Sequence, residues 1–235
     1  MDRPANDVEI WDKWNTTYRQ GRIDEPSKRR LREILAAMSD LKIHDAKIFE
    51  AGCGTGWLSD KLSEFGKVSG CDLGSKIIDT AQANYPHVQF LSGDVHTLNL
   101  PVGTFDVVVT SEVLSHVPDQ PAFIRRLADL LKPGGYLFIT TQNKSVFERR
   151  NDVAPADGWI RQWVTVSMLK DLVRPHFTIR RLTTLEPEGK LGYLKVVNSV
   201  RLNSYCAAVL GPDRIKRLKE SAGFGQSIFV IAKKR

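Results

Sequence analysis

A glycine-rich stretch at residues 47–56, KIFEAGCGTG, constrains the fold of this chain more than any other segment. A short apolar run leads into Glu50, glycines follow at alternate positions, and a helical pattern begins at Trp57. A strand, a tight glycine turn and a helix in this order bring the backbone close to a nucleotide-like ligand. A dinucleotide fingerprint would need glycine where Trp57 stands, so the spacing argues against an NAD-linked oxidoreductase.

The chain around this stretch alternates apolar runs with helical patterns, which is typical of a parallel sheet with crossover helices. We therefore expect an α/β fold with a doubly wound, mostly parallel, seven-stranded sheet. The strands are predicted at 48–50, 68–72, 88–91, 105–111, 136–141, 177–185 and 227–232. Helices are predicted at 57–65, 75–84, 120–131 and 165–173, the third one stopped by the KPGG sequence at 132–135.

Two segments lie outside this core of residues 41–186 and 226–235. Residues 1–40 are predicted to form a helical lid, with helices at 6–20 and 26–38, and Trp14 and Tyr18 fall on one face of the first helix. Residues 187–225 are too long for a hairpin and predict a helical insertion before the last strand. That insertion could pack on the domain, form a homodimer face or cap a substrate. We expect a single domain over 1–235.

Composition sets limits on the partners of the chain. Its 235 residues carry a net charge of +7, which permits nucleic acid as a partner without requiring it. The basic clusters at 28–30 and 233–235 are interpreted as solvated ends. No apolar run approaches the ~20 residues of a membrane span, and no secretory leader is evident, so a cytoplasmic protein is expected. The three cysteines lack metal-ligand spacing, which predicts reduced thiols and no metal site.

Polar side chains stand at the carboxyl ends of the predicted strands, where ligands bind in doubly wound sheets. Asp72 comes about twenty residues after the first glycine, where a carboxylate can accept hydrogen bonds from ribose hydroxyls. Asp94 follows the third strand and can accept from an adenine amino group. The fourth strand ends in the sequence SEVLSH, which contains Glu112 and His116.

These motifs, over about 47–142, resemble those of the class I S-adenosylmethionine (SAM) methyltransferases. The EVLSH and LLKPGG sequences are most similar to the small-molecule branch that includes quinone-biosynthesis O-methyltransferases. The resemblance implies SAM as the cofactor and a small molecule as the methyl acceptor. It also implies a set of cofactor-binding residues: Glu50, Gly52, Gly54, Gly56, Asp72, Leu73, Asp94, Val95, Glu112 and Val113.

The substrate side is predicted from residues beyond the glycine motif. Methyl transfer to oxygen needs a base, and an imidazole, with an ordinary pKa near 6.5, makes His116 the candidate. A structural histidine is the alternative. Gln142 could orient the substrate with its amide, and Arg161, beside Trp159, could bind an anionic group on it. The acceptor atom, the pathway and the oligomeric state are left open by the sequence.

Two other functions are compatible with these motifs. An RNA or protein methyltransferase would explain the positive charge, but the chain lacks the Asn/Asp-Pro-Pro-Tyr motif and an evident RNA-binding module. A non-catalytic SAM-binding partner subunit is the second alternative, because the motifs report binding rather than turnover.

Overall fold

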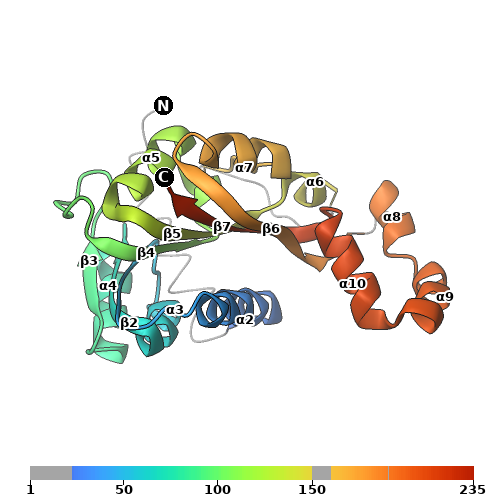
Figure 1. Cartoon of the computed structure of the whole chain (residues 1–235), viewed down its shortest axis with the longest axis horizontal. Helices are drawn as coiled ribbons and strands as arrows, with labels where there is room; N and C mark the ends of the chain where they lie inside the picture. The colour runs from blue at the N-terminus through green and yellow to red at the C-terminus, as the bar shows by residue number, and fades with distance from the viewer. Residues whose placement is uncertain (1–22, 150–159, 190) are drawn as a thin grey trace.

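The structure is a computed structural model of the 235-residue chain, and it describes residues 23–149, 160–189 and 191–235 (Figure 1). The predicted helix at 6–20, with Trp14 and Tyr18, lies outside the described residues, as does Trp159. Within the described ranges, no helix is long and apolar enough to cross a membrane.

One seven-stranded sheet organises the molecule, in the order β3-β2-β1-β4-β5-β7-β6. The first five of these strands are parallel, and β7 runs antiparallel to both of its neighbours. The predicted doubly wound, mostly parallel sheet is thereby confirmed. The strands are β1 (Ala46–Ala51), β2 (Gly66–Asp72), β3 (Gln89–Ser92), β4 (Phe105–Ser111), β5 (Leu131–Gln142), β6 (Phe177–Pro187) and β7 (Gly225–Lys234).

Helices cover both faces of this sheet (Figure 1). Several begin at side chains that accept a hydrogen bond from the first turn: Asp24 caps α2, Asp119 caps α5 and Thr165 caps α7. The described helices are α2 (Glu25–Asp40), α3 (Trp57–Leu62), α4 (Ser75–Asn84), α5 (Gln120–Leu130), α6 (Lys144–Phe147), α7 (Val166–Val173), α8 (Tyr193–Val197), α9 (Val200–Leu210) and α10 (Pro212–Ser221), with short 3-10 turns η1 (Ser63–Phe65) and η2 (Leu114–His116).

The apolar core divides into two layers because side chains along each strand alternate between the two faces of the sheet. On β4, Val107 and Val109 pack toward α2, α3 and α4, whereas Val108 packs toward α5 and α7. Each layer is closed by fully buried side chains, such as Met38 on one side and Phe123 on the other. The β-branched run that predicted a central strand therefore serves both layers.

The largest difference between a predicted and an observed boundary lies at the start of β5. Strand β5 begins at Leu131 rather than at residue 136, and α5 ends at Leu130. Leu131 pairs with Phe105, and the register then shifts before Val107 pairs with Tyr136. The chain thus stays in the sheet through the KPGG sequence by means of this irregularity, instead of leaving it as a turn.

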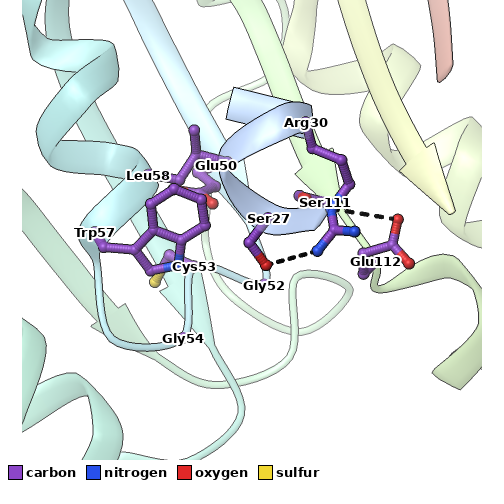
Figure 2. Close-up of a pocket in the computed structure, with 10 residues that line it drawn as sticks. All are labelled: Ser27, Arg30, Glu50, Gly52, Cys53, Gly54, Trp57, Leu58, Ser111 and Glu112. Atoms are coloured by element: carbon purple, nitrogen blue, oxygen red, sulfur yellow. Dashed lines mark hydrogen bonds and ion pairs between the residues drawn. The ribbon is translucent and has the colours of Figure 1, made fainter. Parts of the chain in front are cut away.

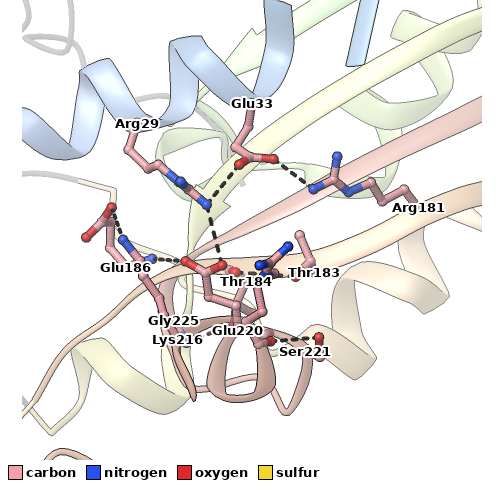
Figure 3. Close-up of polar contacts among 11 residues, drawn as sticks. Arg29, Glu33, Arg181, Thr183, Thr184, Glu186, Lys216, Glu220, Ser221 and Gly225 are labelled. Atoms are coloured by element: carbon pink, nitrogen blue, oxygen red, sulfur yellow. Dashed lines mark hydrogen bonds and ion pairs between the residues drawn. The ribbon is translucent and has the colours of Figure 1, made fainter. Parts of the chain in front are cut away.

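The insertion between β6 and β7 is helical, as predicted, and comprises α8, α9 and α10. Polar contacts hold α10 against α2 and β6 (Figure 3). The buried carboxylate of Glu220 lies 3.5 Å from Arg29 of α2. The backbone oxygen of Glu220 accepts a hydrogen bond from the Thr184 hydroxyl of β6 at 2.6 Å. Glu33 of α2 also pairs with Arg29 and with Arg181 of β6, at 2.8 and 2.7 Å.

Candidate active site

A pocket opens at the carboxyl ends of β1 and β4, where the strand order reverses (Figure 2). The crossover helices leave adjacent strands in opposite directions at such a switch point, and the crevice between them is where ligands bind in doubly wound folds. The lining of the pocket comes from α2, the glycine loop, the start of α3 and the end of β4: Ser27, Arg30, Glu50, Gly52, Cys53, Gly54, Trp57, Leu58, Ser111 and Glu112.

The glycine loop adopts a conformation that only glycine takes without strain. Gly52, Gly54 and Gly56 have φ angles of 78°, 52° and 81°. A Cβ at Gly52 would lie 2.2 Å from Val113, so the backbone there packs directly on the chain that follows β4. A Cβ at Gly54 would meet nothing within 4 Å. The loop is therefore closed at its base and open at Gly54, where a ligand can approach the backbone.

Asp72 is bound to this loop. Its Oδ2 accepts a hydrogen bond from the backbone N–H of Gly54 at 2.9 Å, and the carboxylate is half-buried. The N–H of Gly93 donates to the Asp72 backbone oxygen at 2.8 Å, which connects the ends of β2 and β3. Asp94 follows, and its Oδ1 accepts from the His96 N–H at 2.9 Å, beside the buried Val95. Two predicted ligand-binding carboxylates thus lie at neighbouring strand ends.

Burial shifts the pKa values of Glu50 and of the two cysteines in this region upward, which favours their uncharged forms. Burial raises the pKa of Glu50 to about 8, although Ser59 donates a hydrogen bond to its Oε2 at 2.5 Å. The ligand-free site therefore holds a largely protonated carboxyl group at the end of β1. Burial also raises the pKa of the Cys53 thiol well above its usual value and that of Cys71 to about 12. Both thiols are free and buried, as expected for structural cysteines.

Sequence analysis missed the contribution of α2 to this pocket. Arg30 is only 9% exposed, and its Nη2 donates to the Ser27 hydroxyl at 2.7 Å (Figure 2). Its Nε lies 3.7 Å from Glu112 Oε1, and both of these buried atoms lack a hydrogen bond within the described chain. Within the cluster at 28–30, Lys28 is exposed as predicted, whereas Arg30 is buried in the pocket rather than solvated. The helical spacing in the sequence could have indicated that Arg30 is buried, because Arg30 shares a helix face with the buried Ile34 and Ala37.

His116 lies in η2, directly after β4. Its Nδ1 is 3.0 Å from the backbone oxygen of Ile160. A carbonyl can only accept, so Nδ1 carries the hydrogen, and Nε2 is the basic nitrogen of the neutral ring. The segment that provides this carbonyl is fixed in place, since Gln162 N–H donates to Ser115 O at 2.8 Å and Gln120 Nε2 donates to Gln162 O at 2.7 Å.

The predicted substrate residues lie near this segment. Gln142, at the end of β5, accepts a hydrogen bond from Ser115 through its Oε1 at 2.6 Å, which directs its amide nitrogen away from Ser115. The guanidinium of Arg161 lies 5.4 Å from the ring centre of Trp163, and this ring packs on Phe147 at 5.2 Å. Of the two tryptophans next to Arg161 in the sequence, Trp159 and Trp163, the structure describes Trp163, which contacts the guanidinium.

The structure brings the predicted residues together in two groups. Glu50, Gly52, Gly54 and Glu112 line the pocket directly, and Asp72 joins them through its bond to Gly54. Among the described residues, His116, Gln142 and Arg161 are not part of this lining and form a second group around η2 and residues 160–163. No group of histidine, cysteine or carboxylate side chains in the described ranges is arranged to hold a metal ion.

Comparison with known proteins identifies the family. A family model described as a methyltransferase domain matches residues 20–186. The chain belongs to this family. Ubiquinone biosynthesis O-methyltransferase from Albidiferax ferrireducens is 32% identical over 170 residues, which cover 69% of this chain and 58% of that protein. The protein of the same name from Colwellia psychrerythraea is 38% identical over 113 residues, 44% of each chain. The matched part thus spans about half the length of these curated relatives.

A solved structure extends the comparison to nearly the whole chain. The N-methyltransferase NodS from Bradyrhizobium japonicum, in complex with S-adenosyl-L-homocysteine, has a TM-score of 0.68 and 14% identity, and the match covers 97% of this chain and 98% of that one. The class I methyltransferase fold is therefore confirmed. The methyltransferase domain and its relatives point to SAM as the cofactor.

The residues of the pocket fit SAM, independently of the comparisons with known proteins. The position above Gly54 is open, and a guanidinium and a carboxylate with buried, unbonded atoms lie beside it. The amino acid portion of SAM carries one carboxylate and one ammonium group, which these two side chains complement in charge.

Proposed function

We propose that this methyltransferase domain transfers a methyl group from SAM to an oxygen atom of a small-molecule acceptor. The observation that carries the proposal is the pocket at the switch point, with an open glycine loop bound to Asp72, in a chain of the methyltransferase-domain family. Oxygen as the acceptor atom is supported by the names of the relatives, ubiquinone biosynthesis O-methyltransferases, which cover part of the chain.

Each part of the cofactor site has a proposed role. Asp72 accepts from the ribose hydroxyls, Asp94 from the adenine amino group, and Val95 and Leu73 contact the adenosine portion. Gly52, Gly54 and Gly56 let the backbone approach the methionine portion, together with Glu50 and Val113. Arg30 pairs with the methionine carboxylate, and Glu112 with its ammonium group. When bound, SAM supplies a methyl group on a sulfonium, which is already activated for transfer.

The chain's own contribution to the reaction is orientation and proton removal. Holding acceptor and cofactor in line, in a site that excludes water, can lower the barrier by roughly 7–11 kcal/mol. His116 is the proposed base, because its Nδ1–H bond to Ile160 fixes the tautomer in which Nε2 can take the acceptor hydroxyl proton. Gln142 and Arg161 are proposed to orient the acceptor. Trp14, Tyr18 and Trp159 remain predicted substrate residues outside the described ranges.

Arg30→Ala is expected to lower the affinity for SAM about 10- to 100-fold, since hydrogen bonds to charged groups contribute about 1.5–3 kcal/mol. Isothermal titration calorimetry measures this directly. Arg32→Ala, on an exposed position of the same helix, is the matched control and should bind normally.

A second variant separates binding from folding at this position. Arg30→Ala leaves Glu112 buried without its cation, so the double variant Arg30→Ala/Glu112→Gln should recover melting temperature while SAM binding stays weak, because both proposed partners of the methionine portion are then lost. Wild-type affinity in Arg30→Ala would exclude the proposed role of Arg30.

The function itself is tested with SAM labelled on its methyl group. The purified protein is incubated with labelled SAM and a cell extract, and the products are separated into small molecules, RNA and protein. We expect the label in the small-molecule fraction, and its loss in the Asp72→Ala variant. Label in RNA or protein would reject the proposed substrate class.

The two alternatives give different results in the same experiment. An RNA methyltransferase would label RNA and bind it with a steep dependence on salt, since phosphate contacts release counterions. A non-catalytic partner subunit would bind SAM and label nothing. The homodimer predicted through residues 187–225 and the cytoplasmic location stay predictions.

A further inference from the structure

Helix α9 (Val200–Leu210) carries an apolar stripe that no other part of the described chain covers. Leu202, Tyr205 and Val209 follow one another at helical spacing on one face and are 46%, 77% and 83% exposed. No residue of α9 is buried, although α8 and α10 flank it in the chain. In Figure 1 the α8–α9 pair projects beyond the sheet at the edge where β5 ends and α6 follows, and Tyr193 of α8 donates a hydrogen bond to the Ser145 oxygen of α6 at 3.2 Å. An exposed apolar face of this kind marks an interaction surface.

The same insertion is strongly basic. Between Tyr193 and Ser221 the acidic residues are Asp213 and Glu220, and Glu220 is buried against Arg29. The basic residues of this segment are Lys195, Arg201, Arg214, Lys216, Arg217 and Lys219. The surface charge between Tyr193 and Ser221 is therefore mostly positive, with Asp213 as the exposed acidic residue.

The contacts of α10 fix which of its sides faces outward. Glu220 and Lys216 lie on the inner side, where Lys216 pairs with Glu186 at 3.2 Å (Figure 3). Arg214, Arg217 and the 58%-exposed Leu218 lie on the other side. The anchoring to α2 and β6 thus leaves a basic side of α10 exposed, on a helix that is in contact with α9.

We propose that α9 and α10 dock on the surface of an anionic lipid bilayer. Leu202, Tyr205 and Val209 would enter the headgroup region, while Arg201, Arg214 and Arg217 contact lipid phosphates. Apolar side chains with flanking Lys and Arg are typical of helices that lie in the membrane interface, where tyrosine is also favoured. A second copy of this chain is a poorer occupant, because a two-fold contact would bring two basic faces together.

Cosedimentation of the full-length protein with vesicles tests this docking. Vesicles of phosphatidylglycerol and phosphatidylcholine in equal parts should bind the protein, pure phosphatidylcholine vesicles should bind it weakly, and added salt should release it. We expect Tyr205→Ser/Val209→Ser and Arg214→Gln/Arg217→Gln each to lower binding at least ~10-fold, since each basic residue near an anionic surface contributes a factor of about five. Val102→Ser/Arg125→Gln, an exposed pair elsewhere, is the matched control.

The same variants distinguish lipid docking from dimerisation through α9. The substituted side chains are exposed, so melting temperature and SAM affinity should stay unchanged in all variants. Absence of binding to the anionic vesicles, or binding that neither α9 nor α10 variant weakens, would overturn the proposal. A dimer seen by sedimentation velocity, lost in Tyr205→Ser/Val209→Ser while vesicles fail to bind, would assign the stripe to a second copy instead.

Discussion

Replacing Asp72 with asparagine is expected to weaken SAM binding by roughly 100-fold or more, the larger of the two binding effects predicted for the pocket. The carboxylate accepts from the Gly54 N–H at 2.9 Å, and in the proposed complex it also accepts from the ribose hydroxyls. An asparagine can keep the first bond with its amide oxygen, but its NH₂ group cannot accept from a hydroxyl. Two charge-assisted hydrogen bonds of about 1.5–3 kcal/mol each are at stake.

Two substitutions at Asp72 distinguish an effect on SAM binding from an effect on the stability of the glycine loop. Asp72→Asn should keep the melting temperature of the ligand-free protein near that of the wild type, whereas Asp72→Ala also removes the acceptor for Gly54 and should lower it. Calorimetric titration with SAM gives the affinity in both. Asp79→Asn, the same change at an exposed position of α4, serves as control. If Asp72→Asn binds SAM as the wild type does, the ribose role is wrong.

The sheet and the glycine loop could be predicted because local sequence determines them. Alternation along β4 sends Val107 and Val109 to one layer and Val108 to the other, so a β-branched run indicates a strand buried on both faces. The positive φ angles at Gly52 and Gly54 likewise need glycine, which marks the turn in the sequence. With the right-handed crossover rule, these signals place Asp72 and Glu112 at the same edge of the sheet.

The parts that failed depend on contacts between distant segments. Arg30 was assigned to solvent because it stands in a basic cluster, yet it is buried beside Glu112, which lies on the other side of the pocket. Lys234, in the terminal basic cluster, belongs to β7 and donates from its Nζ to Leu131 O at 2.8 Å. Charge alone does not show whether a long side chain finds a partner, because the partner is supplied by the fold.

The surroundings of His116 show the same limit. Its position after β4 followed from the sequence, but the backbone oxygen of Ile160 that fixes its tautomer belongs to a segment 44 residues away. Gln120, a buried side chain at the start of α5, holds that segment through Gln162. No local pattern connects these residues, so the sequence named the candidate base without the group that orients it.

Replacing His116 with asparagine is expected to lower kcat by 10²- to 10⁴-fold, the range over which general bases contribute. The asparagine amide nitrogen sits near the position of Nδ1 and can still donate to the Ile160 oxygen, so the local structure is kept while the basic Nε2 is removed. Binding of SAM should remain within about twofold of wild type, because the pocket lining does not include His116. Single-turnover methyl transfer to the acceptor identified by labelling measures the effect.

The pH dependence distinguishes a base from a structural histidine. A protonated imidazole cannot accept a proton, so wild-type kcat should fall as the pH is lowered, and the residual rate of His116→Asn should lack that step. His176→Asn, which changes a half-buried histidine beside Phe177, is the control and should keep both rate and profile. A structural role predicts the opposite combination for His116→Asn: an unchanged kcat and pH profile, with a lower melting temperature appearing only in His116→Ala, which loses the bond to Ile160.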